Sequence, residues 1–305
     1  MQHNKNLLIL DCNYLCHRAK HTTGDLSIDS IPTGVVYGFL RDLITFSNMF
    51  HTTNFVFCWD SKTNIRQEIY PAYKQTRRDK EKTDEELAYD VEFRRQIKKL
   101  RRVYLPLIGC SNIFCQKGYE SDDIIASLCL NEFDGYSIII ISADHDMYQC
   151  LSPVVSMYNP QQKKMMTVQK FERQYGIKPH QWVRVKCLAG CTSDNITGIA
   201  GIGEKTAIKY LTHQLKETTK AYQKIESCYN MVIKHNTKFV QLPFKGTKTF
   251  KIKENNYNEA GWIAVCKKLG LKSIEKRNPF MSIKKRKLKD NEERDIVTEN
   301  QFEVY

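Results

Sequence analysis

The chain has 305 residues, with 47 lysines and arginines against 34 aspartates and glutamates, which gives a formal net charge of +13. Hydrophobic residues make up 41% of it, enough to bury a core of roughly two domains, so wholesale disorder is excluded. Its apolar runs fall far below the ~18 residues of a membrane helix, and the N-terminus lacks the apolar core of a signal peptide. We therefore exclude a membrane protein and expect an intracellular, cytoplasmic one, whose excess positive charge favours a polyanionic partner.

Short apolar runs in the first half predict buried strands, and an aspartate follows each run at once or one residue later. The runs are Leu7–Leu10, Phe55–Trp59 and Ser137–Ser142, and the aspartates are Asp11, Asp60 and Asp144. Segments with helical spacing lie between them, at residues 34–50, 84–104 and 121–130. This alternation predicts a parallel sheet, in which the carboxyl ends of the strands meet at one edge. A single strand-end aspartate is commonly a turn or cap residue, but three of them predict convergence.

The pattern changes after Met157, where the strand signal gives way to helices. We expect helices over residues 170–175, 179–189 and 205–215, and an amphipathic helix over residues 257–272 that Gly270 closes. The pattern is weak past His235, and the chain ends in a charged segment. The predicted division is an α/β domain over residues 1–168, a smaller helical domain over 169–280 and a tail over 281–305.

Acidic residues concentrate at the predicted strand ends and at the start of the helix over 121–130. They are Asp11, Asp60, Glu120, Asp122, Asp123, Asp144 and Asp146. Acids also favour a helix N-terminus for purely structural reasons, but that preference does not explain the strand-end acids. So many carboxylates in one pocket raise each other's pKa unless a counter-charge is present.

The chemistry of these acids points to divalent cations. All-oxygen ligands, without paired His or Cys, select Mg²⁺ or Mn²⁺ over zinc. Two such ions held ~3.5–4 Å apart form a site for in-line displacement at phosphorus.

Two further segments carry signals for nucleic-acid binding. Glycines at 198, 201 and 203 free the backbone to bind phosphate at a helix N-terminus, and Lys205 and Lys209 on the following helix favour a duplex backbone. A tight turn between helices explains the glycines equally well. Aromatic and basic residues alternate over residues 66–78, which suits a single strand, although a solvated charged segment is the alternative.

Together these motifs resemble the structure-specific 5′-nucleases, a family that includes flap endonucleases, phage 5′→3′ exonucleases and the 5′-nuclease domain of bacterial DNA polymerase I. The resemblance covers about residues 5–215. It rests on the order and spacing of Asp11 with Arg18, Trp59-Asp60, Tyr70-Pro-x-Tyr-Lys-x-x-Arg77, Glu120-x-Asp-Asp123, Asp144-x-Asp146, Ser193-Asp-Asn-Ile196 and Gly201-Ile-Gly-x-Lys-Thr-Ala207.

The resemblance implies an α/β fold: a PIN-like, mostly parallel sheet with a helical arch over about residues 62–104, followed by a small helix-three-turn-helix domain. In the family the arch admits a free 5′ strand, and the glycine loop grips duplex DNA, often with K⁺. By position, Asp11, Asp60, Glu120 and Asp122 resemble the ligands of the first metal, with Asp123 near it, and Asp144, Asp146 and Asp194 those of the second. Lys74 and Arg77 would hold the scissile phosphate as catalytic residues, Tyr73 would stack on a base and Lys186 would contact a phosphate.

One departure from the family pattern affects the second metal. Cys191 stands where the family has an aspartate, and a neutral thiol is a poor ligand for a hard cation. We expect the second Mg²⁺ to bind more weakly than the first, with higher Mg²⁺ required or Mn²⁺ preferred.

The predicted function is a Mg²⁺-dependent 5′→3′ exonuclease and flap endonuclease that removes RNA primers and flaps in replication. Its expected partners are branched or nicked DNA with a 5′ end and RNA–DNA hybrids. A single-stranded-DNA-binding protein or clamp at the tail is a further candidate, with Phe302–Tyr305 as a possible docking peptide and a disordered end as the favoured alternative. We expect a monomer, and a stand-alone or phage-type enzyme, in the host cytoplasm if phage-encoded. The alternatives are a PIN-type endoribonuclease, for which a duplex-gripping loop has no use, and a nonenzymatic binder of branched DNA.

Overall fold

The computed structural model describes residues 5–131 and 135–280, so the predicted tail and its docking peptide lie outside the described residues. Contacts divide the chain into two compact units. The first unit is Met1–Tyr14, Val56–Leu87 and Ile113–Ile252, and the second is Leu15–Phe55, Ala88–Asn112 and Lys253–Tyr305. The domain boundary expected near residue 168 falls inside the first unit, and the predicted division into domains stays a prediction. Among the described residues, no helix has the length and apolar character needed to cross a membrane.

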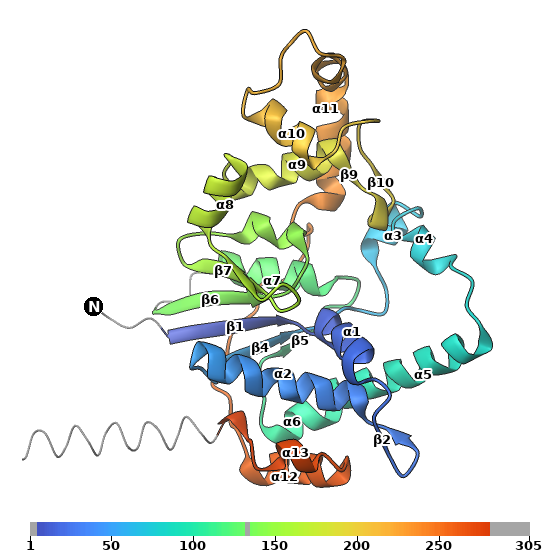
Figure 1. The fold of residues 1–305 in the computed structure, drawn as a ribbon, viewed down its shortest axis with the longest axis vertical. Helices are drawn as coiled ribbons and strands as arrows, with labels where there is room; N and C mark the ends of the chain where they lie inside the picture. The colour runs from blue at the N-terminus through green and yellow to red at the C-terminus, as the bar shows by residue number, and fades with distance from the viewer. Residues whose placement is uncertain (1–4, 132–134, 281–305) are drawn as a thin grey trace, which may run out of the picture. The chain divides into compact units, whose positions relative to one another are not determined.

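A six-stranded sheet in the order β5-β4-β1-β6-β7-β8 forms the centre of the first unit (Figure 1). The strands are β1 (Lys5–Asp11), β4 (Phe55–Cys58), β5 (Ile113–Phe114), β6 (Tyr136–Ile141), β7 (Val155–Asn159) and β8 (Lys164–Met166). β1 pairs parallel with β6, with Leu7 opposite Ile138 and Ile9 opposite Ile140, and β6 pairs parallel with β7. β7 and β8 form an antiparallel hairpin. The mostly parallel sheet and the three strands predicted from the apolar runs are confirmed.

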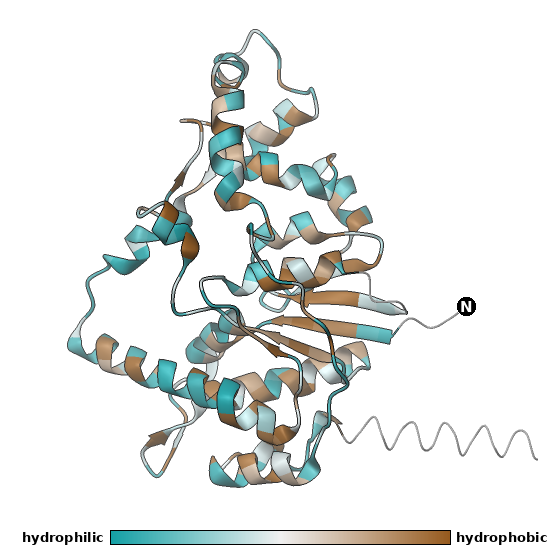
Figure 2. Cartoon of the chain, turned by 180° about the vertical axis from the view of Figure 1, so that it is seen from behind, coloured by the Kyte–Doolittle hydropathy of each residue, from teal (hydrophilic) through white to brown (hydrophobic). Residues whose placement is uncertain are grey.

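The sheet is buried on both faces, as a parallel sheet requires. Leu7 and Ile9 of β1 belong to one hydrophobic cluster that also contains Ile124 of helix α7 (Ser121–Leu130). Leu8 and Leu10, which point to the other face, are fully buried as well. In Figure 2 the strands of the sheet are coloured mainly as hydrophobic residues.

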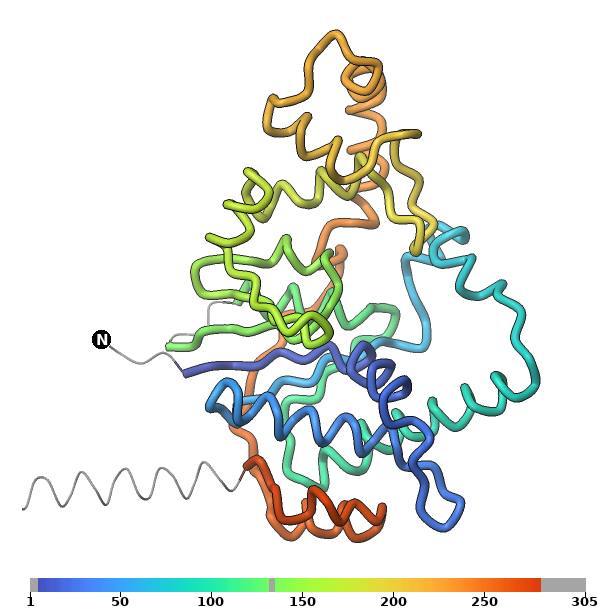
Figure 3. The backbone as a smooth tube through the Cα atoms, viewed as in Figure 1, coloured from blue at the N-terminus to red at the C-terminus, as the bar shows by residue number. Residues whose placement is uncertain are grey.

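The other helices of the first unit are short except for α11, which has 21 residues. They are α3 (Ile65–Ile69), α4 (Gln75–Arg78), η2 (His145–Cys150), α8 (Val168–Tyr175), η3 (Pro179–Gln181), α9 (Trp182–Ala189), η4 (Thr192–Asp194), α10 (Glu204–Leu211) and α11 (Lys220–Val240), with a small hairpin of β9 (Gly190–Cys191) and β10 (Ile196–Thr197). The helix expected over 205–215 already ends at Leu211. Sequence analysis missed α11, which Figure 3 shows returning after the loop that follows α10. Its sequence does carry a helical period, since Ile225, Cys228, Val232 and Phe239 recur at spacings of three, four and seven residues and pack on the hydrophobic clusters.

Most of the remaining elements lie in the second unit. They are α1 (Cys12–Thr23), β2 (Ser27–Ile28), β3 (Ile31–Pro32), α2 (Gly34–Phe50), α5 (Asp84–Lys99), η1 (Leu100–Tyr104), α6 (Leu105–Ile108), α12 (Glu259–Lys268) and α13 (Lys272–Glu275). α2 has the predicted bounds, and the helix expected over 84–104 is α5 with a π-helical turn, η1, at its end. The single helix expected over 257–272 is wrong in extent. Gly270, at φ +62°, separates α12 from α13 because the left-handed region ends a helix.

Phe171 tests the aromatic packing between the sheet and the helices that follow it. Its ring is fully buried and lies 4.9 Å from Tyr175 and 5.6 Å from Trp182 between ring centroids. We expect Phe171→Ala to lower the free energy of unfolding in urea by about 3–5 kcal/mol because it leaves a cavity. Gln174→Ala, at an exposed position of the same helix, should change it little. A loss below about 1 kcal/mol for Phe171→Ala would contradict this packing.

Candidate functional site

The predicted convergence of strand-end acids occurs in the first unit. Asp11 ends β1, and its carboxylate accepts hydrogen bonds from the backbone N of Tyr14 at 3.1 Å and from Ser142 Oγ, just after β6, at 2.9 Å. Asp60 follows β4 and accepts from the backbone N of Ser121, the first residue of α7, at 2.7 Å. These bonds tie the ends of three neighbouring strands to the start of α7.

The carboxylates near this edge of the sheet are crowded, and the nearby cations do not balance all of their charge. We call them the acid group: Asp11, Asp60, Glu120, Asp122, Asp144, Asp146 and Asp194. Burial and the nearby Asp60 raise the pKa of Asp11 to about 7. Burial, with Asp11 and Asp144 close by, raises the pKa of Asp122 well above its usual range. Burial and Asp144 also raise the pKa of Asp146, to about 6, although Lys186 opposes the shift. Such shifts are expected where carboxylates are crowded without enough counter-charge.

Glu120 has both a cation and a hydrogen-bond donor beside its carboxylate. Its carboxylate pairs with Lys74 Nζ and accepts a hydrogen bond from Tyr73 Oη at 2.8 Å. Burial alone would raise its pKa, but Lys74 and Arg66 outweigh burial and lower the pKa of Glu120. Lys74, one of the two predicted catalytic cations, therefore lies at the acid group.

Asp194 and Arg77 are joined in the same way. Arg77 Nη2 donates to Asp194 Oδ1 at 2.9 Å, and the backbone N of Lys74 donates to the backbone O of Asp194 at 3.0 Å. Asn195 adopts φ +58°, and its Oδ1 accepts from the backbone N of Thr76 at 3.2 Å. These bonds attach α4 to the turn η4, so segments more than a hundred residues apart bring Lys74, Arg77 and Asp194 together.

Lys186 has a different environment from the one predicted. Its side chain is almost buried, and Nζ lies 3.0 Å from Asp146 Oδ1 and 3.3 Å from Glu204 Oε1. In this structure Lys186 is a counter-charge of Asp146, and its contact with a phosphate stays a prediction. Cys191 Sγ lies 3.2 Å from Ser193 Oγ, and burial together with Asp194 raises the pKa of the thiol.

Asp123 is committed to a buried ion pair that sequence analysis did not find. Arg66 Nη1 and Nη2 donate to its two oxygens at 2.7 and 2.8 Å, and both side chains are essentially inaccessible. The same oxygens accept from the backbone N of Glu120 at 3.2 Å and of Phe244 at 2.8 Å. The placement of Asp123 among the metal ligands is therefore corrected, because both its oxygens are already used. We call this pair the Arg66–Asp123 clasp.

Tyr73 is buried in this structure, and its predicted stacking on a base stays a prediction. Its side chain is only 3% exposed, in a small hydrophobic cluster with Phe239 and Val240, and its hydroxyl is directed to Glu120. Arg66 and Tyr73 both lie in the basic and aromatic run over 66–78. The only available signal for the role of Arg66 was its place in that run, since its partner lies 57 residues away in the sequence.

The glycine loop divides into two parts. A Cβ on Gly198 would lie 2.3 Å from the backbone C of Ala189 and 2.4 Å from the backbone N of Gly190, so this glycine is required for close packing. Gly201, at φ +81°, and Gly203 face open space and leave the backbone before α10 accessible. Lys205 and Lys209 on α10 are exposed.

The donor chemistry of the acid group fits divalent cations, since every predicted ligand other than Asp123 offers carboxylate oxygens near this edge of the sheet. The side chains are nevertheless not preassembled. Within residues 5–131 and 135–280, no three His, Cys, Asp or Glu side chains have the geometry of a metal site. Three carboxylates of the acid group form ion pairs with Lys74, Arg77 and Lys186.

Comparison with known proteins places the chain in a family. Residues 6–176, more than half of the chain, match the model of the 5'-3' exonuclease, N-terminal resolvase-like domain. The chain is 35% identical over 222 residues to the 5'-3' exonuclease of Bacillus subtilis, covering 68% of this chain and 70% of that protein. The chain belongs to the 5′-3′ exonuclease family.

Other relatives agree in fold and differ in extent. The 5'-3' exonuclease of Buchnera aphidicola is 29% identical over 264 residues, covering 85% of this chain and 84% of that protein. In the thermostable DNA polymerase I of Thermus thermophilus, the match is 33% over 208 residues and covers 67% of this chain but only 24% of the polymerase. The structure of T5 5'-exonuclease with bound zinc superposes with a TM-score of 0.66 at 23% identity, over 78% of this chain and 90% of that one. A T5 D15 flap endonuclease complex with DNA and metal ions gives 0.65 at 20%, over 91% and 98%.

The Arg66–Asp123 clasp predicts a large loss of stability when one partner is removed. Asp123→Asn should lower the free energy of unfolding by about 3–5 kcal/mol, because it leaves the guanidinium of Arg66 buried without its charge partner. Urea unfolding of Asp123→Asn, Arg66→Met and the double variant measures the coupling. If the losses of the single variants simply add in the double variant, the two side chains do not interact as described.

The raised pKa of Asp11 predicts a pH-dependent stability in the presence of EDTA. In the folded protein the raised pKa keeps a proton on Asp11 up to about pH 7, whereas in the unfolded chain the carboxyl ionises near its ordinary pKa of 3.8. The contribution of Asp11 to stability therefore falls as pH rises through this window, by up to about 1.4 kcal/mol per unit. In urea unfolding from pH 4 to 7, the free energy of unfolding of Asp11→Asn should rise relative to that of the native protein. The curve for Asp25→Asn, at an exposed position, should stay parallel to the native curve. Parallel curves for both variants would refute the shift.

Proposed function

We propose that this chain is a Mg²⁺-dependent 5′→3′ exonuclease and flap endonuclease that hydrolyses phosphodiester bonds near 5′ ends of DNA or of RNA paired to DNA. The observation that carries the proposal is the acid group at the carboxyl edge of the sheet together with Lys74 and Arg77. Family membership and the T5 neighbours support it. Removal of RNA primers and flaps in replication is the biological role that we propose on this basis.

The first proposed metal would be held by Asp11, Asp60, Glu120 and Asp122, and the second by Asp144, Asp146 and Asp194. When bound, divalent cations lower the pKa of water and balance the negative charge that develops at phosphorus. Lys74 and Arg77 pair with Glu120 and Asp194 through charge. Lys74 and Arg77 would hold the scissile phosphate and stabilise its charge, while bound cations would supply the counter-charge for these carboxylates.

Substrate binding is proposed for the glycine loop and helix α10. Gly201, Gly203, Lys205 and Lys209 offer open backbone and exposed cations to one strand of a duplex. A K⁺ ion at this loop, binding to a single-stranded-DNA-binding protein or clamp, and a monomeric state remain predictions. Electrostatic contacts of this kind make binding fall steeply with salt.

The two alternatives have less support. An endoribonuclease acting on single strands would share the acid group but would have no use for the accessible glycine loop. A nonenzymatic DNA binder would not need to retain Asp11 and Asp122 in a crowded group that raises their pKa values.

Cleavage of a 5′-labelled flap duplex in Mg²⁺ tests the proposed function. Asp122→Asn should reduce the rate at least about a hundredfold with little loss of flap binding, because it removes a metal ligand. Asp25→Asn, an exposed change of the same chemistry, serves as the matched control. If the native protein binds the flap but cuts it in neither Mg²⁺ nor Mn²⁺, the chain is a binding protein. If it cuts a single-stranded RNA in preference, it is an endoribonuclease.

Cys191 predicts an asymmetry between the two proposed metals. Cys191→Asp restores a carboxylate beside Asp194 and should lower the Mg²⁺ concentration for half-maximal cleavage by about tenfold, since carboxylate oxygens suit Mg²⁺ better than a thiol. Calorimetric titration of Mg²⁺ into the native protein should give one tight and one weak site. Two equally tight sites in the native protein would contradict this asymmetry. Cys191→Ser controls for removal of the thiol alone.

A further inference from the structure

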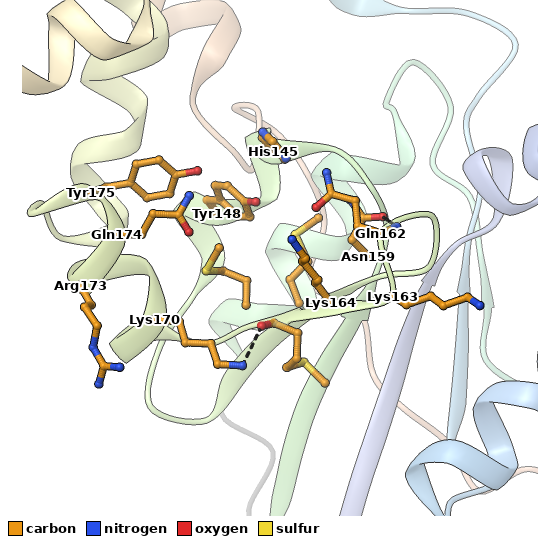
Figure 4. Close-up of a pocket in the computed structure, with 13 residues that line it drawn as sticks. His145, Tyr148, Asn159, Gln162, Lys163, Lys164, Lys170, Arg173, Gln174 and Tyr175 are labelled. Atoms are coloured by element: carbon orange, nitrogen blue, oxygen red, sulfur yellow. Dashed lines mark hydrogen bonds between the residues drawn. The ribbon is translucent and has the colours of Figure 1, made fainter.

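A pocket of about 640 Å³ lies in the first unit between η2, the β7–β8 hairpin and α8, and we call it the hairpin pocket. Figure 4 shows its lining side chains. Met157 and Tyr148, both buried, contribute apolar surface to it. Its volume is in the range of about 300–1,000 Å³ that small organic ligands occupy. The acid group uses none of these side chains.

The hairpin pocket is lined by cations and by no acid. Lys163, Lys164, Lys170 and Arg173 are all exposed lining residues. In Figure 4 the side chain of Lys164 extends toward Asn159 and Gln162, while Lys163 and Arg173 lie at the rim. Lys170 Nζ donates to the backbone O of Met165 at 3.2 Å. Glu172, the acid between Lys170 and Arg173, pairs with Lys178 at 2.9 Å and so leaves these cations without a carboxylate partner there.

Two partly exposed aromatic rings, those of His145 and Tyr175, line the same pocket, and the buried Tyr148 packs against both. The rings of His145 and Tyr148 are stacked, 4.7 Å apart and inclined by 18°. Tyr175 is held beside them by Trp182, 5.0 Å away between ring centroids. Gln174 adds an exposed amide that can bond to polar edges of a ligand.

We propose that the hairpin pocket binds one nucleotide unit of a single-stranded nucleic acid, with the base against the partly exposed rings of His145 and Tyr175 and the phosphate at Lys164 and Lys170. Cations for phosphates and planes for bases are the two features by which proteins hold single strands. The inference goes beyond the proposed cleavage. His145 lies between the proposed metal ligands Asp144 and Asp146 in the chain, so the proposal places a nucleotide beside the segment that carries them.

Photochemical crosslinking tests the inference in the full chain. The probe is a short oligothymidylate carrying 4-thiothymidine, in EDTA so that no cleavage occurs. We expect crosslinks on the peptides that contain His145–Tyr148 and Lys164–Tyr175. The double variant K164E/K170E should reduce these crosslinks about tenfold by reversing the charge at the phosphate. K267E/K268E, an equal charge change on exposed residues of α12, should leave them unchanged.

Competition identifies the source of the nucleotide. If unlabelled oligothymidylate reduces the crosslinks and thymidine 5′-monophosphate does not, the pocket binds a strand. If both reduce the crosslinks equally per nucleotide, the pocket binds a free nucleotide of the same chemistry. Inorganic phosphate as an equally good competitor would overturn the inference. Native protein without crosslinks on these peptides would also overturn it, as would crosslinks that persist in K164E/K170E. Flap cleavage in Mg²⁺ is measured on the same samples, so failure of the pocket is distinguishable from failure of the nuclease.

Discussion

The crowding of carboxylates at one edge of a parallel sheet is the constraint on which the rest of the first unit depends. β1, β4 and β6 end together, and α7 begins at the same place, so their acids cannot avoid one another. Burial and mutual repulsion raise the pKa values of Asp11 and Asp122, which shows that the folded chain meets an electrostatic cost there. A protein does not need such a group for its fold. Its chemistry suits divalent cations and a reaction that builds up negative charge.

Cationic side chains from distant segments limit this cost and link the acid group to its surroundings. Lys74 directly precedes α4 and Arg77 lies within it. Lys186 comes from α9, where it also reaches Glu204 at the start of α10. The glycine loop is thus connected through Lys186 to Asp146. The Arg66–Asp123 clasp fixes α3 against α7 and so holds the backbone that carries Glu120. Charge pairing in this unit therefore positions the proposed ligands as well as neutralising them.

Sequence patterns predicted the sheet and the acid group because both depend on local features. Apolar runs that end in aspartate predict strand ends, and strand order places Asp11, Asp60 and the acids near residue 144 at one edge. The roles of Asp123, Tyr73 and Lys186 depend on partners that no local pattern identifies. Asp123 is satisfied by Arg66 and by the backbone of Phe244, 121 residues later. Helix α11 could have been predicted, since Ile225, Cys228, Val232 and Phe239 recur at helical spacing.

Anomalous diffraction from crystals soaked in Mn²⁺ would test the central claim most directly, namely that the acid group binds divalent cations. We expect a strong anomalous peak among Asp11, Asp60, Glu120 and Asp122, with Lys74 turned away from Glu120. A weaker peak should lie near Asp146 and Asp194, because Cys191 replaces a carboxylate there. Full density for the ligand side chains without any peak at this edge of the sheet, at a Mn²⁺ concentration that supports cleavage, would contradict the account.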